Sequence, residues 1–281
     1  MSSENLEQQM EVTPSEPAQR GVIYPIKLPA RHNPKLQALV DRLNADPDLY
    51  ALWECANVNA VTRLGMSDHG PVHVRLIANI ALRLLRLLAA KGITPNIVKD
   101  HGLTLEDAEV VVSLGALMHD LGMSIHRIDH EQYSLFVAQM KLRETLPAAY
   151  PDARTAAIIR SEVLHAIISH RSEGRPLTLE AGVVRVADAL DMAKGRSRIP
   201  FEAGMVNIHS LSATAIDNVT IAPGADKPIR ITIRMNNSAG IFQVDELLKE
   251  KLKGSGLEPH LEVEATIEGE AERKLIQVFR L

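Results

Sequence analysis

The chain has 281 residues, of which 46% are hydrophobic and only 3% aromatic, and its formal net charge is −4 at pH 7. This length allows one large domain, or a main domain with a smaller one, and the apolar fraction suffices for a core of aliphatic side chains. The slightly negative charge gives no support for a protein that binds nucleic acid through an overall positive field. The single cysteine, Cys55, excludes an intrachain disulfide and a cysteine-rich zinc module, which favours a cytoplasmic location.

Residues 1–30 are polar and interrupted by prolines, and we expect a mobile leader that becomes ordered only near Val22–Leu28. No basic segment followed by an apolar run is found there, so no signal peptide is predicted. The most apolar stretch, from Ile77 to Ala90, is interrupted by Arg83 and Arg86 and is too short to span a membrane.

Residues 31–200 have the apolar spacing of helices and predict one helical domain. Pro34 and Pro71 suit the first turns of two helices, and Thr104 with Asp107 forms a capping-box pattern before another. Glycine and proline residues separate the later segments. The predicted helices cover about 34–43, 49–63, 71–91, 104–122, 130–146, 155–170 and 179–194.

In residues 201–281 the pattern changes from the period of helices to that of strands. Apolar and polar residues alternate over 229–235 and 261–267, as in strands with one buried face. Further strands are predicted near Val219–Ala222 and Lys274–Arg280, with an amphipathic helix around Val244–Leu252. The predicted fold class is therefore mainly α, a helical bundle followed by a small α+β domain of ββαββ order. We expect this domain either to serve dimerisation, in which case the chain would form a homo-oligomer through it, or to cover the substrate.

Histidines concentrate in the helical part, where eight of the eleven lie between His69 and His170. His119 and Asp120 directly follow the apolar run Leu114–Met118, and Asp188 stands within the equally apolar segment Val183–Leu190. An ionised carboxylate beside an imidazole on a buried helix is costly unless an opposite charge compensates it. A shared divalent cation explains both aspartates together, and the sequence therefore predicts a metal centre.

The ordered series His73, His119-Asp120 and Asp188 resembles the H…HD…D signature of the HD superfamily of metal-dependent phosphohydrolases. The flanking residues are similar too: Leu-Met-His-Asp-Leu-Gly surrounds the doublet, and Arg-Val-Ala-Asp-Ala-Leu-Asp surrounds Asp188. The resemblance covers about residues 67–198. It implies an HD-type helical bundle in which these four residues bind a divalent metal and Asp120 bridges to a second ion. Gly174-Arg175-Pro176 departs from the Gly-Tyr-Pro of the HD-GYP subgroup, which disfavours hydrolysis of cyclic dinucleotides.

Two-metal members of this superfamily add histidines between the doublet and the last aspartate, and His130, His165 and His170 are available here. His165 and His170 share one predicted helix and reach one site only if the helix end unwinds, so which of them ligates stays open. His69 is expected to support a ligand rather than to be one. The expected cofactor is a pair of divalent ions of Mn, Fe, Co, Ni or Zn, with Mg as an alternative. The expected metal ligands are His73, His119, Asp120, His130, His165, His170 and Asp188.

Such ions supply hydroxide near neutral pH and hold the attacking and leaving oxygens of a displacement at phosphorus. Asp120 and His130 are the expected catalytic residues. Positive side chains near the ligands in sequence are candidates for binding the phosphate oxygens, although a solvated or salt-bridged role explains each of the basic ones individually as well. These candidates are His126, Arg127, Arg171, Lys194, Arg196 and Arg198. Asp191 is expected to be a structural partner of Arg185 or Arg196.

The expected function is hydrolysis of a phosphate ester or anhydride of a nucleotide or another small phosphorylated metabolite, by attack of metal hydroxide. Two alternatives stay open. Some HD-fold proteins resemble this site but use a diiron centre for oxygenation. The other is a non-enzymatic, metal-stabilised nucleotide sensor that signals to a partner through the C-terminal domain. The complete ligand series argues against this alternative, because an inactive site would be expected to have lost a ligand.

Overall fold

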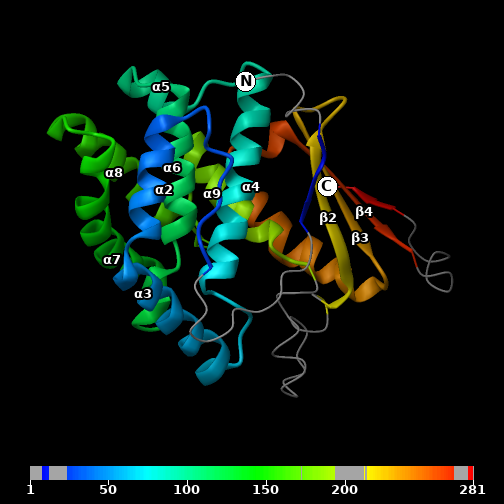
Figure 1. Cartoon of the computed structure of the whole chain (residues 1–281). Coiled ribbons are helices and arrows are strands. Elements are labelled where there is room, and N and C mark those ends of the chain that lie inside the picture. Colours follow the sequence, from blue (N-terminus) through cyan, green and yellow to red (C-terminus); the bar gives the residue numbers. More distant parts are fainter. Residues whose placement is uncertain are drawn as a thin grey trace.

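The computed structural model describes residues 8–12, 24–171, 173–193, 212, 214–268 and 278–280. A helical bundle stands beside a twisted β-sheet, and the helices account for most of the described chain (Figure 1). The helices are α2 (Pro34–Asn44), α3 (Pro47–Asn57), α4 (Pro71–Ala90), α5 (Asn96–His101), α6 (Leu105–Met118), α7 (His130–Thr145), α8 (Ala153–Ser169), α9 (Leu179–Leu190) and α12 (Lys249–Leu252). The strands are β1 (Met10–Val12), β2 (Ile216–Pro223), β3 (Ile229–Met235), β4 (Leu261–Ile267) and β5 (Val278–Arg280).

Local sequence signals start most of these helices. Pro34 and Pro71 occupy the first turns of α2 and α4, and Thr104 with Asp107 forms the predicted capping box at the start of α6. Side-chain oxygens also accept hydrogen bonds from backbone N–H groups at the starts of α3, α8 and α9. The helical part of the prediction is confirmed, with helix ends that differ by a few residues.

Two helical details differ from the sequence-based expectation. The short helix α5 was not predicted, because its first N–H groups are capped from far along the chain: the Glu180 carboxylate accepts from Asn96 N–H at 3.1 Å and Ile97 N–H at 2.9 Å. A cap of this kind leaves no local signal. The helix predicted over 49–63 is α3 followed by a π-helical turn at Val58–Arg63.

Helix α6 forms the centre of the bundle. Every residue from Asp107 to Met118 is buried, and the helix lies against α4, α8 and α9. Because its C-terminal end carries His119 and Asp120, this arrangement brings the doublet into the interior of the bundle.

The sheet has the order β1-β2-β3-β4-β5, and its neighbouring strands are antiparallel except for the parallel pair β3 and β4. A parallel pair requires a crossover, which here contains a π-helical segment at Gln243–Leu248 and then α12. Ile229, Ile231 and Ile233 of β3 are buried while Arg230 and Arg234 are exposed, as the alternating pattern predicted. The predicted ββαββ order is confirmed.

The strand β1 corrects the expectation for residues 1–30. Met10–Val12 pairs with β2, and the Val12 side chain is buried, so part of the predicted leader belongs to the sheet. The open edge of β2 supplies the hydrogen-bonding partner, which the polar local sequence does not reveal.

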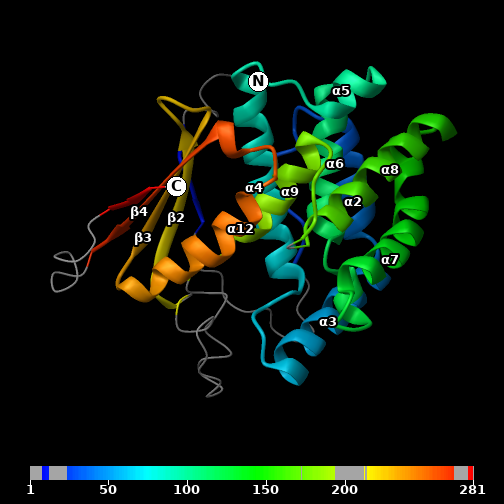
Figure 2. The same cartoon turned by 180° about the vertical axis from the view of Figure 1, so that it is seen from behind.

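The sheet packs directly on the bundle. Helix α4 lies against β2 and β3, and α12 lies against α9, as the view from behind shows (Figure 2). None of the helices in the described residues combines the length and apolar character needed to cross a membrane. The boundary predicted near residue 200 lies outside the described residues and stays a prediction.

Candidate metal centre

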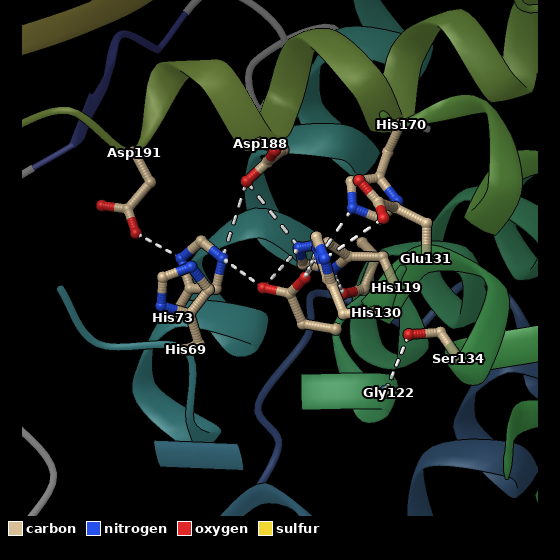
Figure 3. Close-up of polar contacts among 12 residues, drawn as sticks. His69, His73, His119, Gly122, His130, Glu131, Ser134, His170, Asp188 and Asp191 are labelled. Carbon is tan, nitrogen blue, oxygen red and sulfur yellow. Dashed lines mark hydrogen bonds and ion pairs between the residues drawn. The ribbon is translucent and has the colours of Figure 1, made fainter. Parts of the chain in front are cut away.

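Helix ends deliver the polar side chains of the centre. His73 stands in the first turn of α4, His119 and Asp120 follow α6, and His130 is the first residue of α7. His170 follows α8, and Asp188 lies in the last turn of α9. The side chains of the four histidines and Asp188 converge on one region between the helices (Figure 3), and the distances to Asp120 place its carboxylate among them. Residues separated by more than 100 positions in the sequence therefore form one cluster.

Gly122 makes this convergence possible. A Cβ atom at this position would lie 2.0 Å from the carbonyl oxygen of His130 and 2.5 Å from the backbone nitrogen of Ser134. The backbone N–H of Gly122 donates a 2.8 Å hydrogen bond to Ser134 Oγ (Figure 3). The turn after the doublet thus packs tightly against the first turn of α7, which brings His130 next to Asp120.

The two carboxylate oxygens of Asp120 face different pairs of histidines. Oδ2 lies 3.5 Å from His73 Nε2 and 3.3 Å from His119 Nε2. Oδ1 lies 3.3 Å from His130 Nε2 and 3.7 Å from His170 Nε2. Asp120 therefore stands between two groups of nitrogen atoms.

Asp188 joins the first of these groups. Its Oδ1 lies 3.6 Å from His73 Nε2 and 3.7 Å from His119 Nε2. Three groups of residues could each hold an ion, because the ligand atoms within each group lie no more than 4.8 Å from one another. The groups are His73, His119 and Asp188; His119, Asp120 and His170; and His130, Glu131 and His170.

Hydrogen bonds orient three of the imidazoles. His73 Nδ1 lies 2.6 Å from Asp191 Oδ2, His119 Nδ1 lies 2.8 Å from the Ala116 carbonyl oxygen, and His170 Nδ1 lies 2.5 Å from the Ile167 carbonyl oxygen. Since these oxygens accept, each Nδ1 carries a proton, and when a ring is neutral its lone pair is on Nε2, which faces the centre. Such partners are typical of metal-binding histidines.

The carboxylates of the cluster favour positive charge beside them. Burial alone would lower the pKa of His119, but the carboxylates of Asp120 and Asp188 outweigh it and raise the pKa to about 10. Burial opposes ionisation of Asp120, yet the neighbouring histidines, His119 above all, hold its pKa well below the usual value. For His170, burial and then the positive charges of His119 and Lys251 hold the pKa well below its usual value, which favours the neutral ring that binds metals.

The donor set fits divalent cations. Nε2 of His119 is buried and makes no hydrogen bond within the described part of the chain, although carboxylate oxygens lie 3.3 and 3.7 Å away. A cation among these atoms would satisfy the nitrogen and neutralise the carboxylates in place of a proton on the ring. Imidazole and carboxylate together suit first-row transition metals.

His165 does not belong to the cluster, which corrects the expectation that it ligates. It is half-buried, and its Nε2 accepts a 3.0 Å hydrogen bond from the backbone N–H of Leu177. Five residues correspond to a rotation of about 140° beyond one full turn of helix, so His165 and His170 point in different directions while α8 stays regular up to Ser169. His170 is therefore the histidine of this pair that reaches the centre.

The candidate phosphate-binding residues differ in how they lie relative to the metal centre. Arg127 is exposed, and its Nη1 lies 2.8 Å from His130 Nδ1, at the edge of the centre. The ring of exposed His126 accepts from the backbone N–H of Ile128 at 3.0 Å, a local turn contact. Arg171 is adjacent to His170, with its Nη2 3.8 Å from Glu173 Oε2. Lys194, Arg196 and Arg198 lie outside the described residues.

Three contacts near the centre, made by Glu131, Asp191 and Lys251, were not predicted from the sequence. Glu131 could hold an ion together with His130 and His170. It directly follows His130 in the sequence, so its nearness to the centre could have been predicted. Asp191 contacts His73, a contact that was not predicted although the spacing of three residues from Asp188 was an available signal. Its predicted pairing with Arg185 or Arg196 stays a prediction, because Arg196 lies outside the described residues. Lys251 reaches Asp188 from the crossover helix, for which no local signal exists. His69 has its ring centre 5.5 Å from that of His73, beside the cluster as expected.

Comparison with known proteins agrees with this geometry. The family model described as HD domain matches residues 72–193, which contain all the clustered histidines and aspartates. An uncharacterized protein of Methanocaldococcus jannaschii is 42% identical over 232 residues, which cover 83% of this chain and 89% of the relative. No solved structure was found to match the chain significantly. The matched signature and the ligand cluster together make the chain a member of the HD superfamily of metal-dependent phosphohydrolases.

Proposed function

We propose that the chain is a phosphohydrolase with a dinuclear metal centre, which cleaves a phosphate ester or anhydride of a nucleotide or another small phosphorylated metabolite. The observation that carries this proposal is the position of Asp120, whose Oδ2 faces His73 and His119 while its Oδ1 faces His130 and His170. A carboxylate with one oxygen directed to each of two histidine pairs is suited to bridging two ions. The lone cysteine favours a cytoplasmic location for this activity.

The side chains divide into two ligand sets. From the distances to Asp120 and Asp188, His73, His119, Asp120 and Asp188 would hold one ion, and Asp120, His130 and His170 would hold the other. Glu131 lies near the second set. Ions of Mn, Fe, Co, Ni or Zn match these donors, with Mg as an alternative. When bound, they activate water and neutralise the charge that develops on a phosphoryl group during in-line displacement.

Residues of this chain supply the remaining functions. Hydrogen bonds from Nδ1 keep the rings of His73, His119 and His170 directed at the centre, so no reorientation is needed during a reaction. Arg127 is placed at the edge beside His130, where a guanidinium suits a phosphate oxygen.

The test is hydrolysis of a panel of phosphoesters and nucleotides by the full chain loaded with Mn²⁺. The double variant His119→Ala/Asp120→Ala is expected to lose activity and bound metal. His165→Ala is the matched control, because this histidine lies in the same bundle but outside the cluster, and it should retain both. A double variant as active as the wild type would overturn the assignment, and so would a wild-type protein that binds ions but turns over no phosphoester.

A further inference from the structure

A lysine from the C-terminal layer enters the metal centre. Lys251 belongs to α12, within the crossover between β3 and β4, yet its Nζ lies 3.4 Å from Asp188 Oδ2 and donates to the carbonyl oxygen of His170. Asp188 Oδ1 faces His73 and His119, so the two oxygens of this carboxylate are shared between the histidines and the lysine. The sheet domain therefore contributes a positive charge to the site built by the bundle.

Lys251 stands where the cluster is accessible. The side chains of His73 and His119 are fully buried, whereas those of Asp188 and Lys251 are 15% and 17% exposed. A phosphate that enters on the side of Asp188 would therefore meet the ammonium group before it reaches these two buried imidazoles.

The position of this lysine is fixed by Arg185, which is itself buried. Its guanidinium donates to the carbonyl oxygens of Lys251 at 2.8 Å and Glu250 at 3.1 Å, and on the other side to those of Arg171 at 2.8 Å and Gly174. Arg185 also lies one helical turn before Asp188 on α9. One side chain thus joins the three elements that carry Asp188, His170 and Lys251.

We propose that Lys251 is a substrate-binding residue that holds a non-bridging oxygen of the phosphate group, an inference that rests on the proposed function. A positively charged side chain beside metal ligands repels the ions themselves, so it gives no advantage to ion binding alone. It becomes favourable when a phosphate, whose oxygens accept charge-assisted hydrogen bonds, occupies the same space. The C-terminal layer then takes part in recognising the phosphate as well as covering the bundle.

The experiment compares Lys251→Met with wild type and with Lys249→Met. Lys249 is a matched control, since it lies two residues earlier on the same helix but is exposed and pairs with Asp245 at 2.7 Å. Inorganic phosphate binding to the Mn²⁺-loaded full chain and Mn²⁺ binding alone are both measured by calorimetry, and KM is measured on any phosphoester that the wild type hydrolyses. If Lys251→Met does not fold, Lys251→Gln replaces it.

Lys251→Met is expected to weaken phosphate binding and raise KM by about 10- to 100-fold, which corresponds to one charged hydrogen bond. Its affinity for Mn²⁺ should be equal to that of the wild type or higher. Lys249→Met should remain within about threefold of wild type, and Lys251→Arg should recover most of the phosphate affinity. Phosphate binding unchanged in Lys251→Met overturns the proposal, and so does loss of Mn²⁺, which would mean that Lys251 only supports Asp188. Absence of phosphate binding and turnover in the loaded wild type overturns the proposed function and this inference together.

Discussion

Asp191 Oδ2 lies 2.6 Å from Nδ1 of His73, on the side of the ring opposite to the metal ligands. Both side chains are buried, so this contact holds the imidazole in one tautomer and one orientation. Asp191 follows Asp188 by three residues, and the end of α9 therefore supplies both a candidate ligand and the group that orients a ligand on another helix.

Replacing Asp191 should weaken ion binding without removing a ligand. Asp191→Ala is expected to lower the affinity of the first ion by about 10- to 100-fold, because His73 loses the acceptor that fixes its ring. Titration of the metal-free protein with Mn²⁺ measures this change. Asp41→Asn, at an exposed position of α2, serves as the control and should bind ions as the wild type does. An Asp191→Ala protein with unaltered affinity would show that His73 is held by other contacts.

His170 and His165 should differ in the number of ions bound. His170→Ala is expected to remove one ion per chain, since His170 Nε2 faces Asp120 Oδ1, whereas His165→Ala should leave the ion count unchanged. Elemental analysis after dialysis against Mn²⁺ or Zn²⁺ measures the count. The opposite result, with loss of an ion in His165→Ala alone, would contradict the assignment of ligands.

Gly122→Ala should disturb the second ion site through the backbone. The added Cβ would lie 2.0 Å from the His130 carbonyl oxygen, so the start of α7 has to move and carry His130 away from Asp120. We expect loss of one ion and a decrease of about 1–3 kcal/mol in the free energy of unfolding, as overpacking typically costs.

Gly115→Ala is the control for this substitution, because its Cβ would meet only side-chain atoms, at 3.1 Å and beyond. Denaturant unfolding of both variants measures the change in the free energy of unfolding, and elemental analysis measures the number of ions bound. Equal ion counts in Gly122→Ala and wild type would mean that the first turn of α7 adapts without displacing His130.

Glu109 should make stability depend on acidity. Burial alone would raise the pKa of its carboxyl, but hydrogen bonds from Arg86 at 2.7 Å and Asn33 at 2.9 Å outweigh burial and lower it. A folded-state pKa below the unfolded value means that the stabilisation is present above the unfolded pKa and is lost as the pH falls through the folded pKa.

Glu109→Gln should therefore reduce the free energy of unfolding at pH 7 by about 3 kcal/mol, because Arg86 then remains buried beside a neutral group. The difference from wild type should shrink as the pH falls below about 4.5. Unfolding by urea between pH 7 and pH 3 in the presence of a chelator tests this. Glu106→Gln, exposed on the same helix, should change little. A pH-independent difference would assign the effect to packing rather than ionisation.

Much of the bundle and its ligand series could be predicted from the sequence because the signals are local. Apolar spacing located the helices, and His119-Asp120 after an apolar run indicated a buried polar site. The features that escaped prediction depend on distant partners. The capping of α5 by Glu180 and the approach of Lys251 to Asp188 are contacts between residues that are far apart in the sequence. The direction of His165 depends on where α8 ends, which the residue pattern left open.

The buried guanidinium of Arg185 has a consequence for regulation. It donates to a carbonyl group that follows His170 and to two carbonyl groups of α12, so a displacement of α12 would be expected to disturb the segment that carries His170. If a molecule that binds the sheet displaced α12 and thereby changed the ion affinity by some factor, reciprocity would require the ions to change the affinity for that molecule by the same factor. The supply of divalent ions would in this way be reported at a surface remote from the chemistry.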